Sequence, residues 1–191
     1  MPVLILLGVL VVLIIWAIAM YNGLVRLKIQ CDNAWADIDV QLKRRYDLIP
    51  NLVETVKGYA AHEKGTLEAV INARNRAMSA TGPAEKAEAE NMLSGALKSL
   101  FALSEAYPQL RAIEAFTSLQ NSLAQIEDSV QNARRYYNAV VRDLNTKILQ
   151  FPTSIFAGML GFKPREFFEV SAPAEREAPK VTFGNPAAPT A

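Results

Sequence analysis

The sequence predicts an all-α protein, in which an N-terminal transmembrane helix continues into an antiparallel bundle of about four helices, two of them long. Three observations support this fold class. Residues 2–21 are apolar and uncharged, long segments repeat apolar residues at steps of three and four, and glycine and proline gather at a few boundaries. We therefore expect a membrane anchor at residues 1–23, a helical domain at residues 24–170, and a disordered tail rich in proline and alanine at residues 171–191.

Residues 2–21 have the length and composition of a membrane span. Twenty residues at helical rise cover about 30 Å, which is the thickness of the hydrocarbon core of a bilayer. Thirteen of the residues from Val3 to Ile18 are leucine, isoleucine or valine, which favour insertion. The competing interpretation is a cleaved signal peptide, because residues 17–19 read Ala-Ile-Ala. A basic segment before the apolar run is missing and the run is long for a signal peptide, so we expect the anchor to be retained.

The orientation of the anchor is predicted from the charges that flank it. Arg26 and Lys28 follow the apolar stretch, whereas no basic side chain precedes it. Because basic loops stay on the cytoplasmic side of a membrane, this asymmetry favours a cytoplasmic domain. An extracytoplasmic domain is the alternative.

Beyond the membrane, residues 21–61 repeat apolar or small residues with a period of 3.5. The stripe consists of Leu24, Leu27, Cys31, Trp35, Ile38, Leu42, Tyr46, Ile49, Val53, Val56 and Ala60. Such a period is typical of a long helix that packs along one face, as in a coiled coil. Pro50 lies inside the segment, but the stripe keeps its phase on both sides, so we expect a kink there rather than a helix end.

Two shorter helices and a second long one complete the predicted bundle. A helix is expected at about residues 66–80, and a third helix follows the turn Thr81-Gly82-Pro83. The last helix is predicted at residues 109–150, where neither glycine nor proline occurs. Phe151-Pro152 should end it.

The two long segments have nearly equal lengths and matching stripes, so we expect them to pack side by side in opposite directions. In this arrangement Cys31 lies opposite residues 141–144, and the short helices run down and up between the long ones. The last helix then returns to the membrane. The phenylalanine-rich residues 151–168 either lie near the bilayer surface or cap the bundle.

Residue types limit the chemistry that the chain can carry. It has one cysteine, Cys31, and one histidine, His62, which excludes zinc sites and di-iron sites built on Glu-x-x-His pairs. No Gly-x-Ser-x-Gly, phosphate-binding or dinucleotide-binding motif occurs, and we expect no catalytic residue, cofactor or metal. Twenty basic and nineteen acidic residues leave a net charge of +1, which gives no electrostatic attraction for nucleic acid.

The candidate interaction patch is Lys43, Arg44 and Arg45, the one run of three basic residues. It could bind acidic lipids or a partner. The alternative is a solvated helix face, because Asp39 and Asp47 lie four residues before and after Lys43.

Asn138 and Asn145 lie seven residues apart, one step past the apolar stripe of the last helix. Polar residues at such positions can fix the register between helices, and ordinary surface amides are the alternative. The residues alone do not separate the two interpretations.

Four segments have a distinctive sequence: AWADIDVQLKRRYDLIPNLVETVKGYAAHEKGTLEAVINAR, LFALSEAYPQL, FTSLQNSLAQIEDSVQNARRYYNAVVRDLNTKILQFP and GFKPREFFEV. They resemble the LemA family of bacterial membrane proteins, and the resemblance covers about residues 21–170. The chain departs from the family pattern at Leu144-Asn145, where a second Tyr-Asn pair is expected. The resemblance implies a single-pass protein of the bacterial plasma membrane with an antiparallel helical bundle. Some members act in magnetosome membrane formation, which suggests scaffolding. The resemblance supplies no catalytic residue.

Together these observations favour a non-enzymatic scaffold or adaptor of the bacterial envelope. Its expected partners are the lipid bilayer and either a second copy of the chain or another membrane or envelope protein. The alternative function is a lipid-surface module that uses Lys43, Arg44, Arg45 and residues 151–168. An enzyme is the third alternative.

Overall fold

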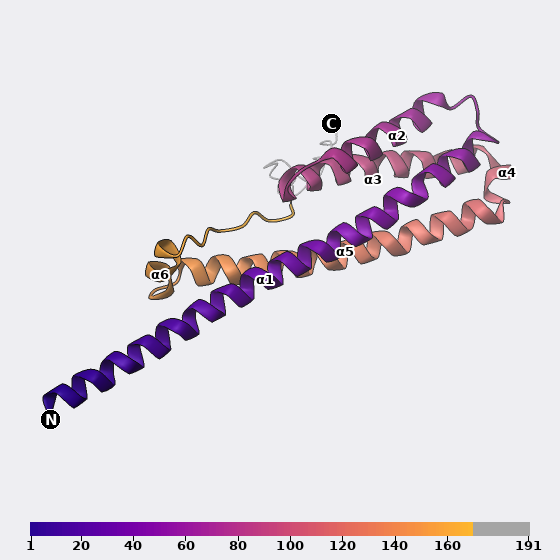
Figure 1. Cartoon of the computed structure of the whole chain (residues 1–191). Helices are drawn as coiled ribbons and strands as arrows, with labels where there is room; N and C mark the ends of the chain where they lie inside the picture. The colour runs from indigo at the N-terminus through magenta and orange to yellow at the C-terminus, as the bar shows by residue number, and fades with distance from the viewer. Residues whose placement is uncertain (170–191) are drawn as a thin grey trace, which may run out of the picture.

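The computed structural model describes residues 1–169, so the tail expected at residues 171–191 and the last residue of the expected helical domain lie outside the described residues. The described part is helical, which confirms the predicted fold class (Figure 1). Its elements are α1 (Pro2–Lys57), α2 (Lys64–Ser79), α3 (Pro83–Ala106), α4 (Pro108–Arg111), α5 (Glu114–Leu149) and α6 (Thr153–Met159).

Helix α1 carries both the apolar N-terminal stretch and the main apolar stripe of the bundle. Its 56 residues extend over about 84 Å at the usual helical rise. The helix continues through Pro50, as the unbroken stripe predicted, and ends at Lys57 rather than at the predicted residue 61. Its N-terminal part projects beyond the bundle with large apolar side chains exposed, and by length and composition it can span a membrane.

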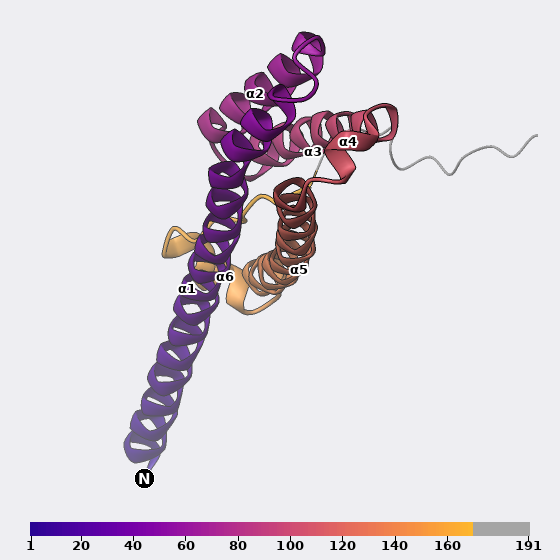
Figure 2. The ribbon, with the colours of Figure 1, turned by 90° about the vertical axis from the view of Figure 1, so that its right-hand side faces the viewer.

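Helices α1 and α5 lie side by side in opposite directions, as predicted (Figures 1 and 2). The rings of Trp35 and Tyr137 lie 5.4 Å apart, and Arg45 Nη2 lies 2.9 Å from Glu127 Oε2. Between these two contacts the chain advances ten residues along α1, from Trp35 to Arg45, and goes back ten residues along α5, from Tyr137 to Glu127. This register places the buried Cys31 opposite the buried Val141, within the predicted interval.

The predicted start of the last helix at residue 109 is wrong. The chain forms the short helix α4, and α5 begins only at Glu114, after Ile113 with extended backbone angles of φ −83° and ψ 117°. Leu110 in α4 is fully buried, and Ile113 packs against the core. Tertiary packing therefore sets this break, which no glycine or proline marks after Pro108.

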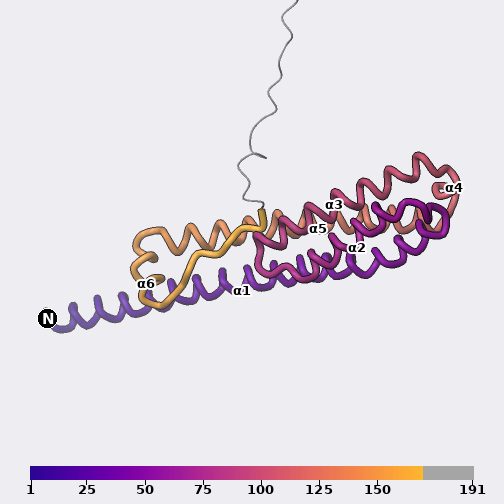
Figure 3. The backbone as a smooth tube through the Cα atoms, turned by 90° about the horizontal axis from the view of Figure 1, so that it is seen from above, coloured from indigo at the N-terminus to yellow at the C-terminus, as the bar shows by residue number. Residues whose placement is uncertain are grey.

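Helices α2 and α3 form a hairpin that covers the half of the α1–α5 pair farther from the N-terminus (Figure 3). The turn predicted at Thr81-Gly82-Pro83 is present. Gly82 has φ +79°, a left-handed conformation that glycine adopts without strain. Glu85 Oε2 accepts hydrogen bonds from the backbone N–H and the hydroxyl of Thr81, at 3.0 and 3.2 Å, which fixes the start of α3.

After α6 the chain turns at Gly161 and runs back along α5; we call residues 160–169 the strap. Two amides of α5 bind its backbone. Asn145 accepts a hydrogen bond from the N–H of Arg165 at 2.8 Å and donates to its carbonyl at 2.9 Å. Asn138 makes the same pair of bonds to Phe168, at 2.8 and 3.2 Å. The two asparagines therefore hold the strap.

Candidate functional site

The three residues of the predicted patch do not share one surface. Lys43 is exposed with its ammonium 3.8 Å from Asp47, and Arg44 is exposed and donates to Gln41 at 3.3 Å. Arg45 points into the bundle and is only 4% exposed. The exposed basic surface of this run is therefore limited to Lys43 and Arg44.

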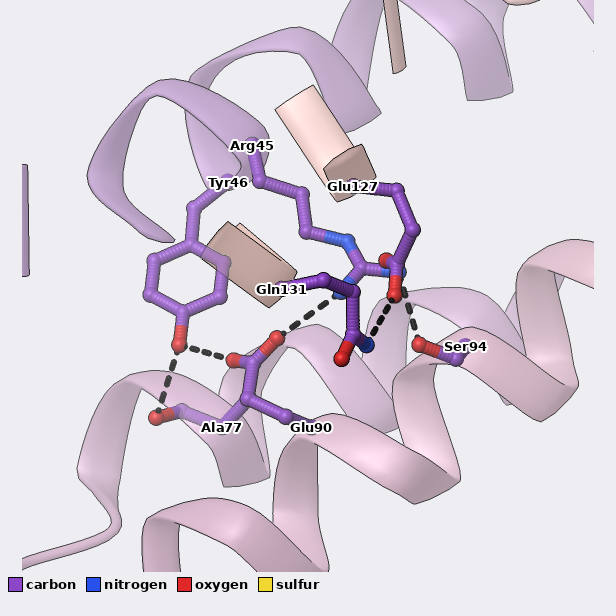
Figure 4. A network of polar contacts seen from close by, with 7 residues as sticks. All are labelled: Arg45, Tyr46, Ala77, Glu90, Ser94, Glu127 and Gln131. Atoms are coloured by element: carbon purple, nitrogen blue, oxygen red, sulfur yellow. Dashed lines mark hydrogen bonds and ion pairs between the residues drawn. The ribbon is translucent and has the colours of Figure 1, made fainter. Parts of the chain in front are cut away.

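Arg45 is the centre of a buried polar network that joins α1, α3 and α5 (Figure 4). Its Nη1 donates to Glu90 Oε2 at 3.0 Å, and its Nη2 donates to the Ser94 hydroxyl at 2.9 Å. Nη2 also lies 2.9 Å from Glu127 Oε2, as an ion pair without hydrogen-bond geometry. Gln131 donates to the other oxygen of Glu127 at 2.9 Å. Arg45 thus connects side chains that are distant in sequence.

Tyr46, the next residue, connects the network to α2. Its hydroxyl donates to Glu90 Oε1 and lies 3.3 Å from the carbonyl of Ala77. Arg74 of α2 donates from Nε to the carbonyl of Tyr46 at 2.8 Å. The network therefore ties together all four of the longer helices.

Burial raises the pKa of two side chains in this network, Glu90 and Tyr46. Glu90 is 5% exposed, and loss of solvent raises the pKa of its carboxyl group above the ordinary value, against the opposing effects of Tyr46 and Arg45. Burial is also the main cause that raises the pKa of the Tyr46 hydroxyl, with the hydrogen bond to Glu90 second. Both shifts favour the neutral forms of these groups.

The network fits a role in fixing the positions of the helices. A groove of about 410 Å³ between α3 and α5 reaches Arg45, Ser94 and Glu127, but much of its remaining wall is apolar. Arg45 faces the carboxylates of Glu90 and Glu127, and within residues 1–169 the network leaves only Arg45 Nε and Glu127 Oε2 without a hydrogen bond among its buried side-chain atoms. Such buried polar groups are well suited to specifying register.

The two residues with the strongest potential for side-chain chemistry lie far apart. Cys31 is fully buried in the α1–α5 interface, where burial raises the pKa of its thiol. His62 is exposed in the loop between α1 and α2, and the neighbouring Glu63 accepts a hydrogen bond from the Tyr107 hydroxyl at 3.0 Å. Within residues 1–169, no group of three histidine, cysteine or acidic side chains is placed to hold a metal ion.

A second candidate site lies where α1 leaves its apolar segment. A cavity of about 690 Å³ opens between α1 and the strap, and the side chains of Lys28 and Lys163 both line it. Arg165 also lines this cavity, but its guanidinium is paired with Asp32 at 2.6 Å. Sequence reasoning missed Lys163, because its proximity to Lys28 depends on the path of the strap.

Comparison with known proteins places these features in a family. The family model described as "LemA family" matches residues 34–183, which is most of the chain. The chain belongs to the LemA family. The matched region begins in the middle of α1, beyond the apolar N-terminal stretch.

The chain is also similar to individual LemA-like proteins. It is 25% identical over 175 residues to "Magnetosome protein MamQ 2" of Paramagnetospirillum magneticum, with 78% of this chain and 64% of that protein covered. It is 27% identical over 154 residues to "Protein LemA" of Metamycoplasma hominis, with 78% of this chain and 69% of that protein covered. The chain thus spans somewhat less than two thirds of the length of the magnetosome relatives.

Proposed function

We propose that this LemA family protein is a membrane-anchored, non-enzymatic scaffold or adaptor of the bacterial envelope. The observation that carries the proposal is the continuity of α1, which runs without a break from the apolar stretch into the core of the bundle. A domain coupled in this way has a fixed position relative to its span. Such a geometry is useful for holding another molecule at a defined distance from a bilayer.

The distribution of polar groups supports a structural role. The buried polar network of Arg45 is used in contacts between helices, and the thiol of Cys31 lies inside the core. The names of the MamQ relatives refer to the magnetosome, and a scaffold at a membrane is consistent with that setting. We propose no magnetosome role for this chain.

The proposed location is the bacterial plasma membrane, with one span and a cytoplasmic domain. Arg26 and Lys28 support this orientation from α1, and Lys147 and Lys163 add two positive charges near the same end of the bundle. Protease treatment of intact spheroplasts tests it. Degradation of the domain from outside would reverse the orientation.

Retention of the anchor has its own test. Intact-mass measurement of the protein extracted from membranes should give a chain that still contains residues 2–21. A mature chain that begins at Met20, after the Ala-Ile-Ala sequence, would identify a cleaved signal peptide instead.

The proposed partner is a second copy of the chain or another membrane or envelope protein. Crosslinking in intact cells, purification of the full chain in mild detergent and mass spectrometry should yield a stoichiometric partner or a homo-oligomer. A monomer without a stoichiometric partner would count against a scaffold. Labelling of a side chain by an activity-based probe would favour an enzyme.

A further inference from the structure

The part of the bundle nearest the apolar segment carries an exposed apolar surface formed by α6 and its flanking turns. Leu149, Phe151, Ile155, Met159 and Leu160 are between 50% and 80% exposed. No charged residue occurs from Ile148 to Phe162. Exposure of these apolar side chains to water is unfavourable, so we expect the surface to lie against an apolar phase.

Contacts of α6 with α1 place this surface at the depth of the last turns of the apolar segment. Phe156 packs edge-on against Trp16 with ring centroids 5.9 Å apart, and Phe162 packs against Tyr21 at 6.2 Å. Thr153 Oγ1 lies 3.6 Å from Met20 Sδ. Trp16 lies five residues before Tyr21, which is about 8 Å along the helix. Measured from Tyr21 as the edge of the bilayer, this distance is a typical depth for helices that lie in the membrane interface.

The segments that form and flank this apolar surface contain basic residues but no acidic ones. Residues 1–31 and 144–164 contain Arg26, Lys28, Lys147 and Lys163 but no aspartate or glutamate. Among the side chains that the structure describes, none forms an ion pair or hydrogen bond with Lys28 or Lys163. Asp32, four residues after Lys28, also lines the cavity, but its carboxylate is paired with Arg165.

We infer that α6 lies in the bilayer interface as a second membrane contact, and that the cavity between Lys28 and Lys163 holds the phosphate of an acidic phospholipid. The charged side chains that line the cavity are Lys28, Lys163, Arg165 and Asp32, so its lining is net positive and fits an anionic headgroup. Tyr21, Val25, Leu160 and Phe162 supply apolar walls that can contact acyl chains, and the two ammonium groups face the headgroup. This inference rests on the anchoring proposed above.

The first test measures the depth of α6 in the full chain, reconstituted in nanodiscs with nitroxide-labelled lipids. A fluorophore on Met159→Cys, in a Cys31→Ala background, should be quenched by the nitroxide. The matched control is Met78→Cys, which is also exposed but lies in α2. Equal, weak quenching at both positions would overturn the interfacial placement of α6.

The second test measures lipid selectivity by native mass spectrometry of the detergent-solubilised full chain with equimolar phosphatidylglycerol and phosphatidylcholine. The wild type should retain phosphatidylglycerol preferentially. Because a lysine near an acidic lipid contributes about fivefold in affinity, Lys28→Gln/Lys163→Gln should lower this preference by about 25-fold. Lys43→Gln/Arg44→Gln, which removes two exposed charges elsewhere on α1, should leave it unchanged.

Three results would overturn the lipid site. They are equal retention of both lipids by the wild type, an equal loss in the control variant, and displacement of the lipid by inorganic phosphate, which would identify a site for a free anion. Extraction of the wild type from membranes by alkaline carbonate would instead refute the proposed anchor, so the two failures are distinguishable.

Discussion

Removal of the Glu90 carboxylate should destabilise the bundle far more than removal of an exposed carboxylate on the same helix. In Glu90→Ala the guanidinium of Arg45 keeps Ser94 and the partly exposed Glu127, but loses the carboxylate that lies 3.0 Å away. Tyr46 also loses its acceptor on Glu90. Both groups remain buried and only partly compensated.

The expected cost follows from this burial. Breaking a buried ion pair by deleting one partner costs about 3–5 kcal/mol, because the other charge is left without compensation. Glu88, two residues earlier on α3, is paired with Arg76 at 3.1 Å, but both side chains are more than half exposed. Glu88→Ala should therefore cost less than about 1 kcal/mol.

Thermal unfolding of the full chain in detergent, followed by circular dichroism at pH 7.5, measures the difference. For a chain of this size, 3–5 kcal/mol corresponds to a fall in Tm of about 6–20 °C, against at most a few degrees for Glu88→Ala. The double variant Arg45→Met/Glu90→Leu should recover much of the loss, since neither charge remains buried. Equal Tm values for Glu90→Ala and Glu88→Ala would refute the role assigned to the network.

Three further predictions follow from pKa values, the strap and the helix register. Because burial raises the pKa of Glu90, the folded chain retains a proton that the unfolded chain loses; the part of the stability that depends on this proton is therefore fully present below pH 4.5 and is lost as pH rises through the raised pKa. Glu90→Gln should lack this dependence, and denaturant titrations that give parallel pH profiles for both proteins would contradict it. Asn145→Ala removes two hydrogen bonds to the strap and should cost about 1–3 kcal/mol and speed hydrogen exchange there, whereas Asn132→Ala, on the exposed face of α5, should not. Val141→Cys should form an intrachain disulfide with Cys31 under oxidant, and a persistently free Cys31 thiol would show that the register is wrong.

The long-range architecture was predictable because it depends on repeated residues. The apolar stripes around Cys31 and Trp35 run for many turns, and two such stripes of similar length have few ways to pack. The predicted antiparallel pair and its register were therefore correct. The start of α5 was not predictable in this way, since the extended backbone at Ile113 depends on how Leu110 is buried.

The buried network was missed because residue type was given more weight than residue position. Arg45 lies one heptad after Ile38 and one heptad before Leu52, and both of these residues are fully buried. Glu90 likewise lies seven residues before the buried Leu97 on α3. A charged residue in phase with an apolar stripe is thus a usable signal of a buried ion pair.

The strap could not be predicted from periodicity, because its backbone is irregular. Its paired backbone hydrogen bonds come from Asn138 and Asn145, whose spacing of seven residues indicated a common face of α5 but not the segment that they bind. Lys28 and Lys163 line the same cavity only because of the path that the strap takes. This irregular segment is held by individual hydrogen bonds, the buried ring of Phe168 and the ion pair of Arg165 with Asp32.

The unbroken passage of α1 from apolar segment to bundle makes the helix a lever. From Tyr21 to Lys57 it extends about 54 Å, so a change of about 10° in the tilt of the span displaces the far end of the helix by about 9 Å. Spans adjust their tilt to the thickness of the surrounding bilayer. With the proposed span in place, a local thinning or thickening of the membrane would therefore be converted into a movement of the α2–α3 hairpin several times larger than the change in thickness itself.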